Sequence, residues 1–492
     1  MSRLPNHPTR WRAALGASLA LAVTLTAYAQ TDDFATPPQP AAPRPLRIDA
    51  PTEQRLPNGL RVVLAERRGV QLVTAQLVVL SGSEVDPPVR SGLAAMTAAL
   101  LTKGTRQRSA TAQAQAAESL GGSLDSSAGW DRSDVAITVT VPKLDAALGL
   151  LAEAVQQPSF AQAEIDRLRT QSLDELKVTY TQPGTLAALA GQHLLFGNNA
   201  YGRPASGTPA SLPRITRADL VALHAASFRP DNAVLVFAGD VDAETAMQLA
   251  RKHFGAWKAA ARMLRPAPAA TSSAELPRAA LIDLPQSGQA AVVITTAMPP
   301  LGADRAIAAV TNAVLGGGYS SRLNQEIRIQ RGLSYSAGSQ LESRRGAAIL
   351  RVMVQTKNPS AAEVVALAQA ELDRLIATPV GEAELGARKA TLIGNFSRSV
   401  ETTAGLGAGV AALVVAGLPP DTLRTRIAAY EAVSPAEVQR FATDRLGAAS
   451  RRIIVAGDAA SFADALMAQA PGLVTVPAAA IDLERGDGLE RR

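Results

Sequence analysis

The feature that most constrains the fold is a repeat, because two segments far apart in the sequence share one pattern. ITRADLVALHAASFRPDNAVLVFAGD and VSPAEVQRFATDRLGAASRRIIVAGD each contain a hydroxyl residue suited to cap a helix, Thr216 or Ser434. Each then continues as a helix and a short strand that ends in Ala-Gly-Asp. Thr216 and Ser434 lie 218 residues apart, as do Gly239 and Gly457. These equal offsets favour a duplication into two domains of about 220 residues each.

Each half opens with strand-like runs and continues with helical patterns. The first half has LRVVLAE and QLVTAQLVVLSGS, and the second has AALIDLP and QAAVVITTAMP. Their β-branched residues favour strands. Helical patterns follow at 111–120, 142–155 and 161–180. Because strands and helices mix without strict alternation, the sequence predicts an α+β fold, with a mostly antiparallel sheet covered by helices in each half.

The N-terminus is typical of an export signal. The basic sequence RWR precedes an apolar run that ends in Ala27-Tyr28-Ala29. The run is short for a spanning helix, which needs about 20 apolar residues. We therefore expect cleavage after Ala29 and a periplasmic location, with an uncleaved membrane anchor as the alternative. The later run GVAALVVAGL, at 409–418, has only the length of a core helix or strand.

Composition divides the chain further. A Pro/Ala-rich stretch follows the signal, and a second Pro- and Ala-rich stretch lies near the middle of the mature chain. The expected parts are a signal peptide (1–29), a tether (30–45), an N-terminal domain (46–258), a linker (259–277), a C-terminal domain (278–480) and a charged tail (481–492).

Charge and cysteine content exclude some functions. The net charge is +6, and three of the arginines belong to the signal segment. No cluster of Lys and Arg with interleaved aromatic residues is present, which disfavours nucleic-acid binding. The chain has no cysteine, so disulfides and thiolate metal sites are excluded.

The helical segment GLAAMTAALLTKGT, at 92–105, has alanine at three positions that share one helix face: Ala95, Ala98 and Ala99. His, Glu and His at these positions would form H-x-x-E-H, the inverted zinc-peptidase motif. Alanine can neither bind a metal nor accept a proton. The four histidines of the chain form no local pair. We therefore expect this chain alone to bind no zinc, since a catalytic site needs about three protein ligands.

The flanks of this segment resemble the insulinase/pitrilysin-type zinc peptidases, and within them the shorter bacterial and mitochondrial-processing-type subunits. That family's motif reads roughly G-L-A-H-F-L-E-H-M-L-F-K-G-T and aligns here without gaps. The segments FGNNAYGRPASGT (196–208) and VLGGGYSSRLNQEIRIQRGLSYSAGS (314–339) resemble two further family segments. The resemblance implies that Ala95, Ala98 and Ala99 replace the first His, the Glu base and the second His.

The resemblance also assigns candidate residues elsewhere. The family's last zinc ligand falls on Glu175, within IDRLRTQSLDEL, and an auxiliary acid falls on Leu168 and is lost. A family Arg and Tyr that hold the substrate backbone fall on Arg328 and Tyr335, which are seven residues apart. Arg can offer a rigid fork of donors and Tyr a hydroxyl to a carbonyl that develops charge.

Each of these three retained residues also has a simpler interpretation. Glu175 could be a solvated helical charge with nearby counter-charges. Arg328 could form a salt bridge, since Glu326 and Arg331 are close in sequence. Tyr335 could be a half-buried aromatic residue of a strand.

Together these features predict a non-catalytic subunit of a two-chain zinc peptidase. The homologous partner would carry H-x-x-E-H and the zinc, and this chain, without a cofactor of its own, would supply Arg328 and Tyr335. Each chain would form half of a clamshell around a closed chamber for peptides or unfolded segments. The alternative is a purely structural or peptide-binding scaffold of the same fold. The missing ligands disfavour an independent hydrolase.

Overall fold

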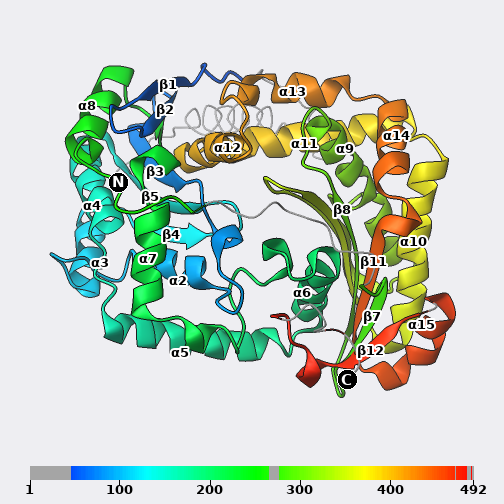
Figure 1. Cartoon of the computed structure of the whole chain (residues 1–492). Helices are drawn as coiled ribbons and strands as arrows, with labels where there is room; N and C mark the ends of the chain where they lie inside the picture. The colour runs from blue at the N-terminus through cyan, green and yellow to red at the C-terminus, as the bar shows by residue number, and fades with distance from the viewer. Residues whose placement is uncertain (1–45, 265–275, 471, 485–488, 490–492) are drawn as a thin grey trace, which may run out of the picture. The chain divides into compact units, whose positions relative to one another are not determined.

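The computed structural model describes residues 46–264, 276–470, 472–484 and 489. The expected signal peptide and tether, most of the expected linker and most of the charged tail lie outside these described residues. The compact unit Arg47–Arg492 contains two six-stranded sheets (Figure 1). Helices cover both sheets, so the α+β architecture is confirmed.

The first sheet has the strand order β1-β2-β6-β3-β5-β4. Strands β2 and β6 run parallel, and the other neighbours run antiparallel. The strands are β1 (Thr52–Arg55), β2 (Arg61–Glu66), β3 (Leu72–Val79), β4 (Leu124–Ala128), β5 (Ser133–Thr140) and β6 (Ala233–Gly239).

The second sheet has the strand order β12-β7-β11-β8-β10-β9. Strand β7 runs parallel to both β11 and β12, and the remaining neighbours run antiparallel. The strands are β7 (Ala279–Asp283), β8 (Ala290–Met298), β9 (Ser334–Ser343), β10 (Ala348–Thr356), β11 (Arg451–Gly457) and β12 (Val474–Pro477).

The two sheets are copies of one another except at one edge. Strands β2, β3 and β6 each start 218 residues before their counterparts β7, β8 and β11. Strand β1 pairs antiparallel with its neighbour, whereas β12 at the equivalent edge pairs parallel. The offset found in the sequence therefore holds for these three neighbouring strands of each sheet, and the predicted duplication is confirmed.

Helices follow the same repeat. Thr216 and Ser434 each cap a helix through a capping box, with Asp219 or Glu437 as the reciprocal partner. The helices of the first half are α2 (Leu93–Leu100), α3 (Ala110–Ser119), α4 (Leu144–Gln156), α5 (Gln162–Thr179), α6 (Pro183–Phe196), α7 (Arg217–Ser227) and α8 (Ala243–Phe254). Those of the second are α9 (Arg305–Leu315), α10 (Ala361–Ala377), α11 (Glu382–Ser399), α12 (Thr403–Val415), α13 (Thr422–Ala432), α14 (Pro435–Arg445) and α15 (Ala463–Gln469).

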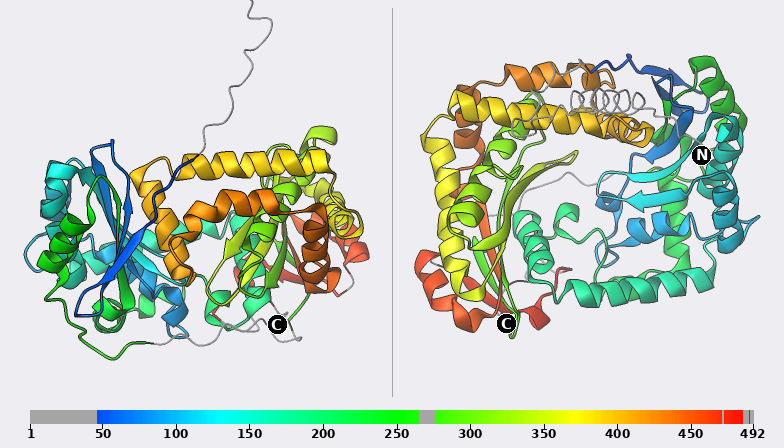
Figure 2. Two further views of the ribbon diagram at one scale, coloured as in Figure 1. Left: turned by 90° about the horizontal axis from the view of Figure 1, so that it is seen from above. Right: turned by 180° about the vertical axis from the view of Figure 1, so that it is seen from behind.

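One helix of each half packs against the sheet of the other half. Helix α6 contacts β8 and β11, and its residues Leu186 and Leu194 share a core cluster with Ile454. Helix α12 contacts β3 and β6, where the hydroxyls of Thr403 and Thr74 lie 2.9 Å apart. Each sheet is thus covered by its own helix on one face, α4 or α10, and by the exchanged helix on the other (Figure 2).

Helix α12 contains most of the apolar run 409–418 and is a core helix, as the length of the run allowed. Across the described ranges, no helix combines the length and the apolarity needed to cross a membrane.

Candidate functional site

The degenerate zinc-site helix is α2, and its N-terminus is held by a buried carboxyl group. The Asp86 oxygens accept hydrogen bonds from the amides of Gly92, at 3.0 Å, and Ala94, at 2.9 Å. Gly92 has φ +91°, a left-handed conformation that glycine adopts without strain. These contacts place the helix against α5, α7 and β4.

Three methyl groups occupy the positions where the family motif would place its zinc ligands and base. Ala98 is fully buried, whereas Ala95 and Ala99, one turn apart, are partly exposed. Methyl groups offer a metal no lone pair. In the described part of the chain, no group of three or more His, Asp or Glu side chains is arranged to hold a metal ion. The residues present therefore do not fit the family's zinc.

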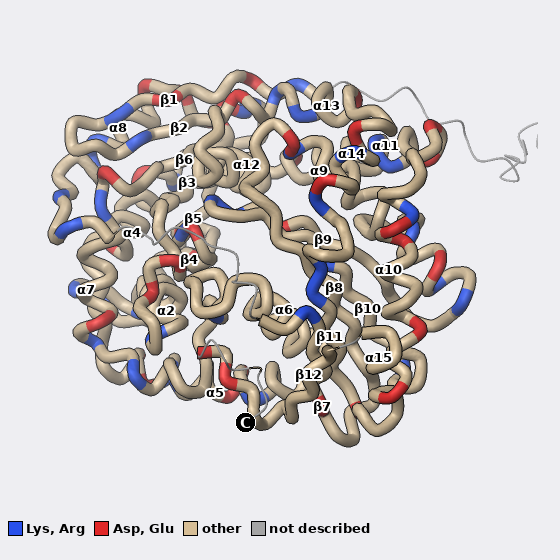
Figure 3. The backbone as a smooth tube through the Cα atoms, turned by 45° about the vertical axis from the view of Figure 1, so that its right-hand side comes forward, with Lys and Arg blue, Asp and Glu red and all other residues tan. Residues whose placement is uncertain are grey.

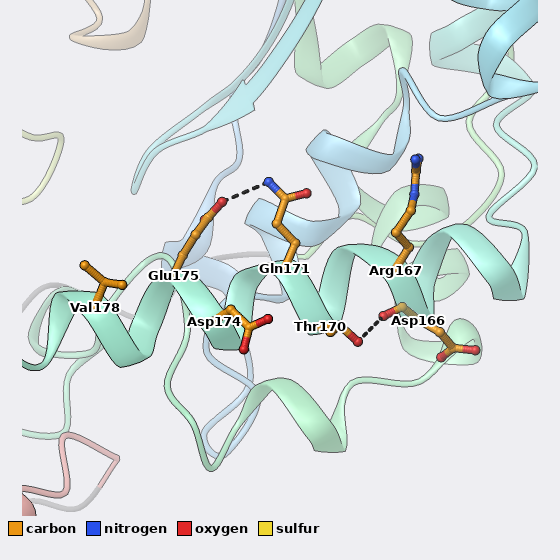
Figure 4. Close-up of a pocket in the computed structure, with 7 residues that line it drawn as sticks. All are labelled: Asp166, Arg167, Thr170, Gln171, Asp174, Glu175 and Val178. Atoms are coloured by element: carbon orange, nitrogen blue, oxygen red, sulfur yellow. Dashed lines mark hydrogen bonds between the residues drawn. The ribbon is translucent and has the colours of Figure 1, made fainter.

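Glu175 lies on the exposed face of α5. Its Oε1 accepts a hydrogen bond of 2.9 Å from Gln171 Nε2 (Figure 4). The neighbouring Asp174 pairs with Lys177 at 2.7 Å. An open groove of about 810 Å³ runs along this helix. Leu168, at the position of the lost auxiliary acid, packs against the hydrophobic core of the first half. Glu175 is thus available to solvent.

The described histidines contact groups outside α2. His193 is buried, and its Nδ1 lies 3.3 Å from the Gly202 carbonyl. His224 Nε2 lies 2.7 Å from the carbonyl oxygen of Val155. His253 Nε2 lies 2.7 Å from the Asp145 carboxylate.

Arg328 and Tyr335 lie on a segment that begins where α9 ends. The backbone of Gly316 packs against β9, and the Ser339 amide donates to its carbonyl at 2.9 Å. A Cβ at Gly316 would come within 2.2 Å of that amide nitrogen, so the close approach requires glycine. A π-helix, Asn324–Gln330, then carries Arg328, and β9 carries Tyr335.

The structure brings Arg328 and Tyr335 together and adds a third residue, Tyr319. The Arg328 guanidinium carbon lies 5.1 Å from the ring centroid of each tyrosine. This distance is within the range of cation–π attraction. Tyr335 is 88% exposed and Tyr319 is 65% exposed. Tyr335 is a residue of a strand, as its simpler interpretation had it, but the expectation that it is half-buried is wrong.

The salt-bridge interpretation of Arg328 is also wrong. Glu326 pairs instead with Arg331, at 2.8 Å. Within the described residues, Arg328 forms no ion pair. Its guanidinium faces a pocket of about 680 Å³, and the described lining of this pocket contains no Asp or Glu. The lining residues are Gly316, Gly317, Gly318, Tyr319, Asn324, Arg328, Ser336, Ala337, Gly338, Ser339, Gln340 and Met353.

The sequence prediction missed Tyr319. The segment LGGGYSS was interpreted there only as a glycine-rich turn, although it contains one of the six tyrosines of the chain. An aromatic residue in a glycine-rich turn is seldom buried, and that is the signal that could have found it. No described residue lines both the Arg328 pocket and the groove beside Glu175. The described lining of the Arg328 pocket also contains none of Ala95, Ala98, Ala99 and Glu175.

Comparison with known proteins gives the same family for both halves. Residues 61–208 match the family model described as Insulinase (Peptidase family M16), and residues 214–392 match the model described as Peptidase M16 inactive domain. A Mycobacterium tuberculosis protein named uncharacterized zinc protease is 30% identical over 356 residues, which cover 72% of this chain and 81% of that protein. A Helicobacter pylori protein named non-peptidase homolog YmxG is 26% identical over 361 residues, covering 73% of this chain and 82% of that protein.

Solved structures show the same fold. The peptidase M16 inactive domain from Pseudomonas fluorescens superposes with a TM-score of 0.77 at 25% identity, over 83% of this chain and 98% of that one. A protease from Helicobacter pylori superposes with a TM-score of 0.78 at 19% identity, over 83% of this chain and all of that one. From the matched models and the M. tuberculosis relative, this chain belongs to the insulinase family, peptidase family M16, and contains that family's inactive domain.

Proposed function

We propose that this chain is the non-catalytic subunit of a heteromeric zinc peptidase. A homologous partner chain carries H-x-x-E-H and the zinc, and this chain contributes Arg328 and Tyr335 as a substrate clamp. Substrates are peptides or unfolded segments held in a chamber between the two chains. A chain with alanine at 95, 98 and 99 needs such a partner if it is to take part in hydrolysis.

The observation that supports this proposal most directly is that the Arg328 guanidinium has no carboxylate partner among the described residues. This cation lies beside two exposed tyrosine rings and a pocket whose described lining contains no Asp or Glu. An unpaired guanidinium keeps its fork of donors free for a backbone carbonyl or carboxylate of a peptide. Tyr335 holds its hydroxyl in solvent, where a substrate can reach it.

The test is turnover of a fluorogenic peptide by the complex co-purified with its zinc-bearing partner. Arg328→Ala or Tyr335→Phe should lower kcat/KM by about 10²–10³, the usual effect of losing one donor to the tetrahedral intermediate. Zinc content and assembly should stay unchanged, because the metal is bound by the other chain. Arg331→Ala, three residues further along, is the matched control and should keep wild-type turnover.

Each outcome has a clear meaning. Wild-type turnover by both clamp variants would overturn the clamp and favour the alternative, a structural or peptide-binding scaffold. Loss of assembly would make the two residues structural. Stoichiometric zinc and peptide hydrolysis by this chain alone would overturn the non-catalytic assignment.

We also propose that the mature protein is exported to the periplasm after cleavage behind Ala29. The basic and apolar segments of the N-terminal sequence support this proposal, and they lie outside the described residues. Mass spectrometry of the mature N-terminus tests it, and a product that retains Trp11 would contradict cleavage.

A further inference from the structure

A second pocket lies in the first half, formed by the end of α4, one face of α7 and the segment after α8. Its volume is about 610 Å³, within the range of small-molecule sites. It contains none of the zinc-site positions and neither clamp residue, so the inference below does not depend on the proposed function. The lining residues are Arg106, Gln156, Gln157, Pro158, Ser159, Phe160, Arg217, Val221, His224, Ala225, Phe228, Ala256, Trp257, Lys258 and Ala260.

Packed rings form one part of this pocket. His224 stacks on Phe228 with centroids 4.9 Å apart and meets the edge of Phe160 at 5.5 Å. Trp257 adds a further, mostly buried ring. Val221 is 41% exposed and leaves apolar surface open to a ligand. The site therefore offers an apolar wall of packed rings.

The charged side chains of the lining all have the same sign. Arg106, Arg217 and Lys258 line the pocket, and the described lining has no Asp or Glu. Arg217 already donates to the carbonyls of Phe160, at 2.9 Å, and Ser159, at 3.2 Å. Arg106 and Lys258 are exposed and form no ion pair with any described residue. Two cations are thus available to a ligand.

The backbone of the pocket is held in an unusual conformation. Phe160 has φ +44°, in the left-handed region that residues other than glycine rarely adopt. The two hydrogen bonds from Arg217 and the bond from the Ser159 amide to Gly104 hold it there. Such strain persists only where the surroundings impose it, and it is concentrated at binding sites.

We propose that this pocket binds a small aromatic anion, with its ring system against Val221 and the ring wall and its negative group beside Arg106 and Lys258. The apolar wall can pack against the aromatic ring of the ligand. The two cations, with no Asp or Glu in the described lining, can attract the negative group of the ligand. His224 adds no third free cation, because burial and the Arg106 charge lower its pKa.

The test uses 8-anilinonaphthalene-1-sulfonate, a fluorescent aromatic anion, with the purified mature chain. We expect one bound probe per chain and energy transfer from Trp257, which Trp257→Phe should greatly reduce. Arg106→Gln/Lys258→Gln should weaken binding at least tenfold. The control Arg68→Gln/Lys177→Gln removes the same charge from two exposed sites outside the pocket and should change the affinity less than twofold.

Two further probes distinguish the contribution of the aromatic rings to binding from that of the negative charge. N-phenyl-1-naphthylamine, which has the rings without the sulfonate, should bind at least tenfold more weakly than the anionic probe. Inorganic phosphate at millimolar concentration should not displace the probe. The proposal is overturned if the pocket variant binds like wild type, if both double variants weaken equally, or if the neutral probe binds as tightly as the anion.

Discussion

Among single residues, Glu84 is a buried carboxyl group whose ionisation bears on stability. Its side chain accepts a hydrogen bond from the Gly82 amide at 2.9 Å, and Arg345 lies 3.6 Å from its other oxygen. Burial raises the pKa of Glu84 to about 7, although the charge of Arg345 acts in the opposite direction. The charge of Asp131 also acts to raise this pKa. The fold therefore prefers the protonated form.

This preference predicts a pH dependence with a definite sign. The unfolded pKa is about 4.3, so between roughly pH 4.5 and pH 7 the folded state holds a proton that the unfolded state has released. The Glu84 contribution to the unfolding free energy should therefore fall as pH rises through this window, by at most about 4 kcal/mol. Urea unfolding at pH 5 and pH 8 should show a flatter profile for Glu84→Gln than for wild type. Exposed Glu118→Gln is the control, and parallel profiles for wild type and Glu84→Gln would contradict the argument.

The alanines of α2 allow a second prediction at this scale. Ala95 and Ala99 are partly exposed, so they can accept larger side chains that buried Ala98 could not. Ala95→His/Ala99→His should bind zinc with Glu175 as the third ligand, and adding Glu175→Gln should weaken that binding about tenfold or more. Isothermal titration measures this. Asp174→Asn is the neighbouring control, and equal losses from both substitutions would exclude Glu175 as a ligand.

The sequence indicated Arg328 and Tyr335 as a candidate pair, but it did not predict the structure around them. Seven residues of separation do not reveal that a π-helix and an edge strand bring the two side chains together. Tyr319 joins them because the backbone turns at Gly316, against β9. Such a turn depends on a strand from a later part of the chain, which local periodicity does not describe.

Among elements, the strands buried on both faces were the easiest to predict, and the edge strands were the hardest. Strands β3 and β8 carry runs of buried β-branched residues. Strands β4 and β9 read LDSSA and SYSAGSQLES and are half exposed, so their sequences resemble loops. The sequence also did not reveal which sheet α6 and α12 pack against. A helix that is apolar around its whole circumference is expected to be buried, but this pattern does not indicate which sheet covers it.

The exchanged position of α6 predicts a contrast between two helical glycines. A Cβ at Gly191 would lie 2.9 Å from Ile454 Cδ1 in the second sheet, whereas a Cβ at Gly386 on α11 meets open space. Gly191→Leu should therefore destabilise the protein by about 1–3 kcal/mol or more through overpacking. Gly386→Leu should be neutral or stabilising by up to about 1 kcal/mol, from helix propensity. Chemical denaturation of both variants checks this, and similar values would contradict the packing of α6 against β11.

At the scale of the compact unit, a hairpin adds a third link between the halves. The turn between β9 and β10 reaches the first half, where the Arg345 amide donates to Asp131 at 2.7 Å and the Gly346 amide donates to the Tyr201 hydroxyl at 3.1 Å. Arg344 lies 3.6 Å from the Trp130 ring centroid. Acidic and basic residues are interspersed over both halves (Figure 3), so no large field of one sign opposes this contact.

These links predict that neither half folds alone. A fragment of residues 46–264 would expose the face of α6 that contains Leu186 and Leu194, and its sheet would lose the cover of α12. Both leucines are fully buried in the whole chain, and exposing each one costs about 1.5–3 kcal/mol. The fragment 276–492 would lose α6 in the same way. A domain stabilised by only about 5–15 kcal/mol cannot lose a whole covering helix and remain folded.

The whole chain should therefore unfold in a single cooperative transition, the same by circular dichroism and by tryptophan fluorescence. Each fragment alone should lack a cooperative transition, and mixing the two should restore one. A chain cut by a protease site inserted within the linker is the control, since it keeps every contact of α6 and α12 and should still unfold in one step. Two separate transitions in the intact chain, or a cooperative transition in either isolated fragment, would show that the exchanged helices are not needed for folding.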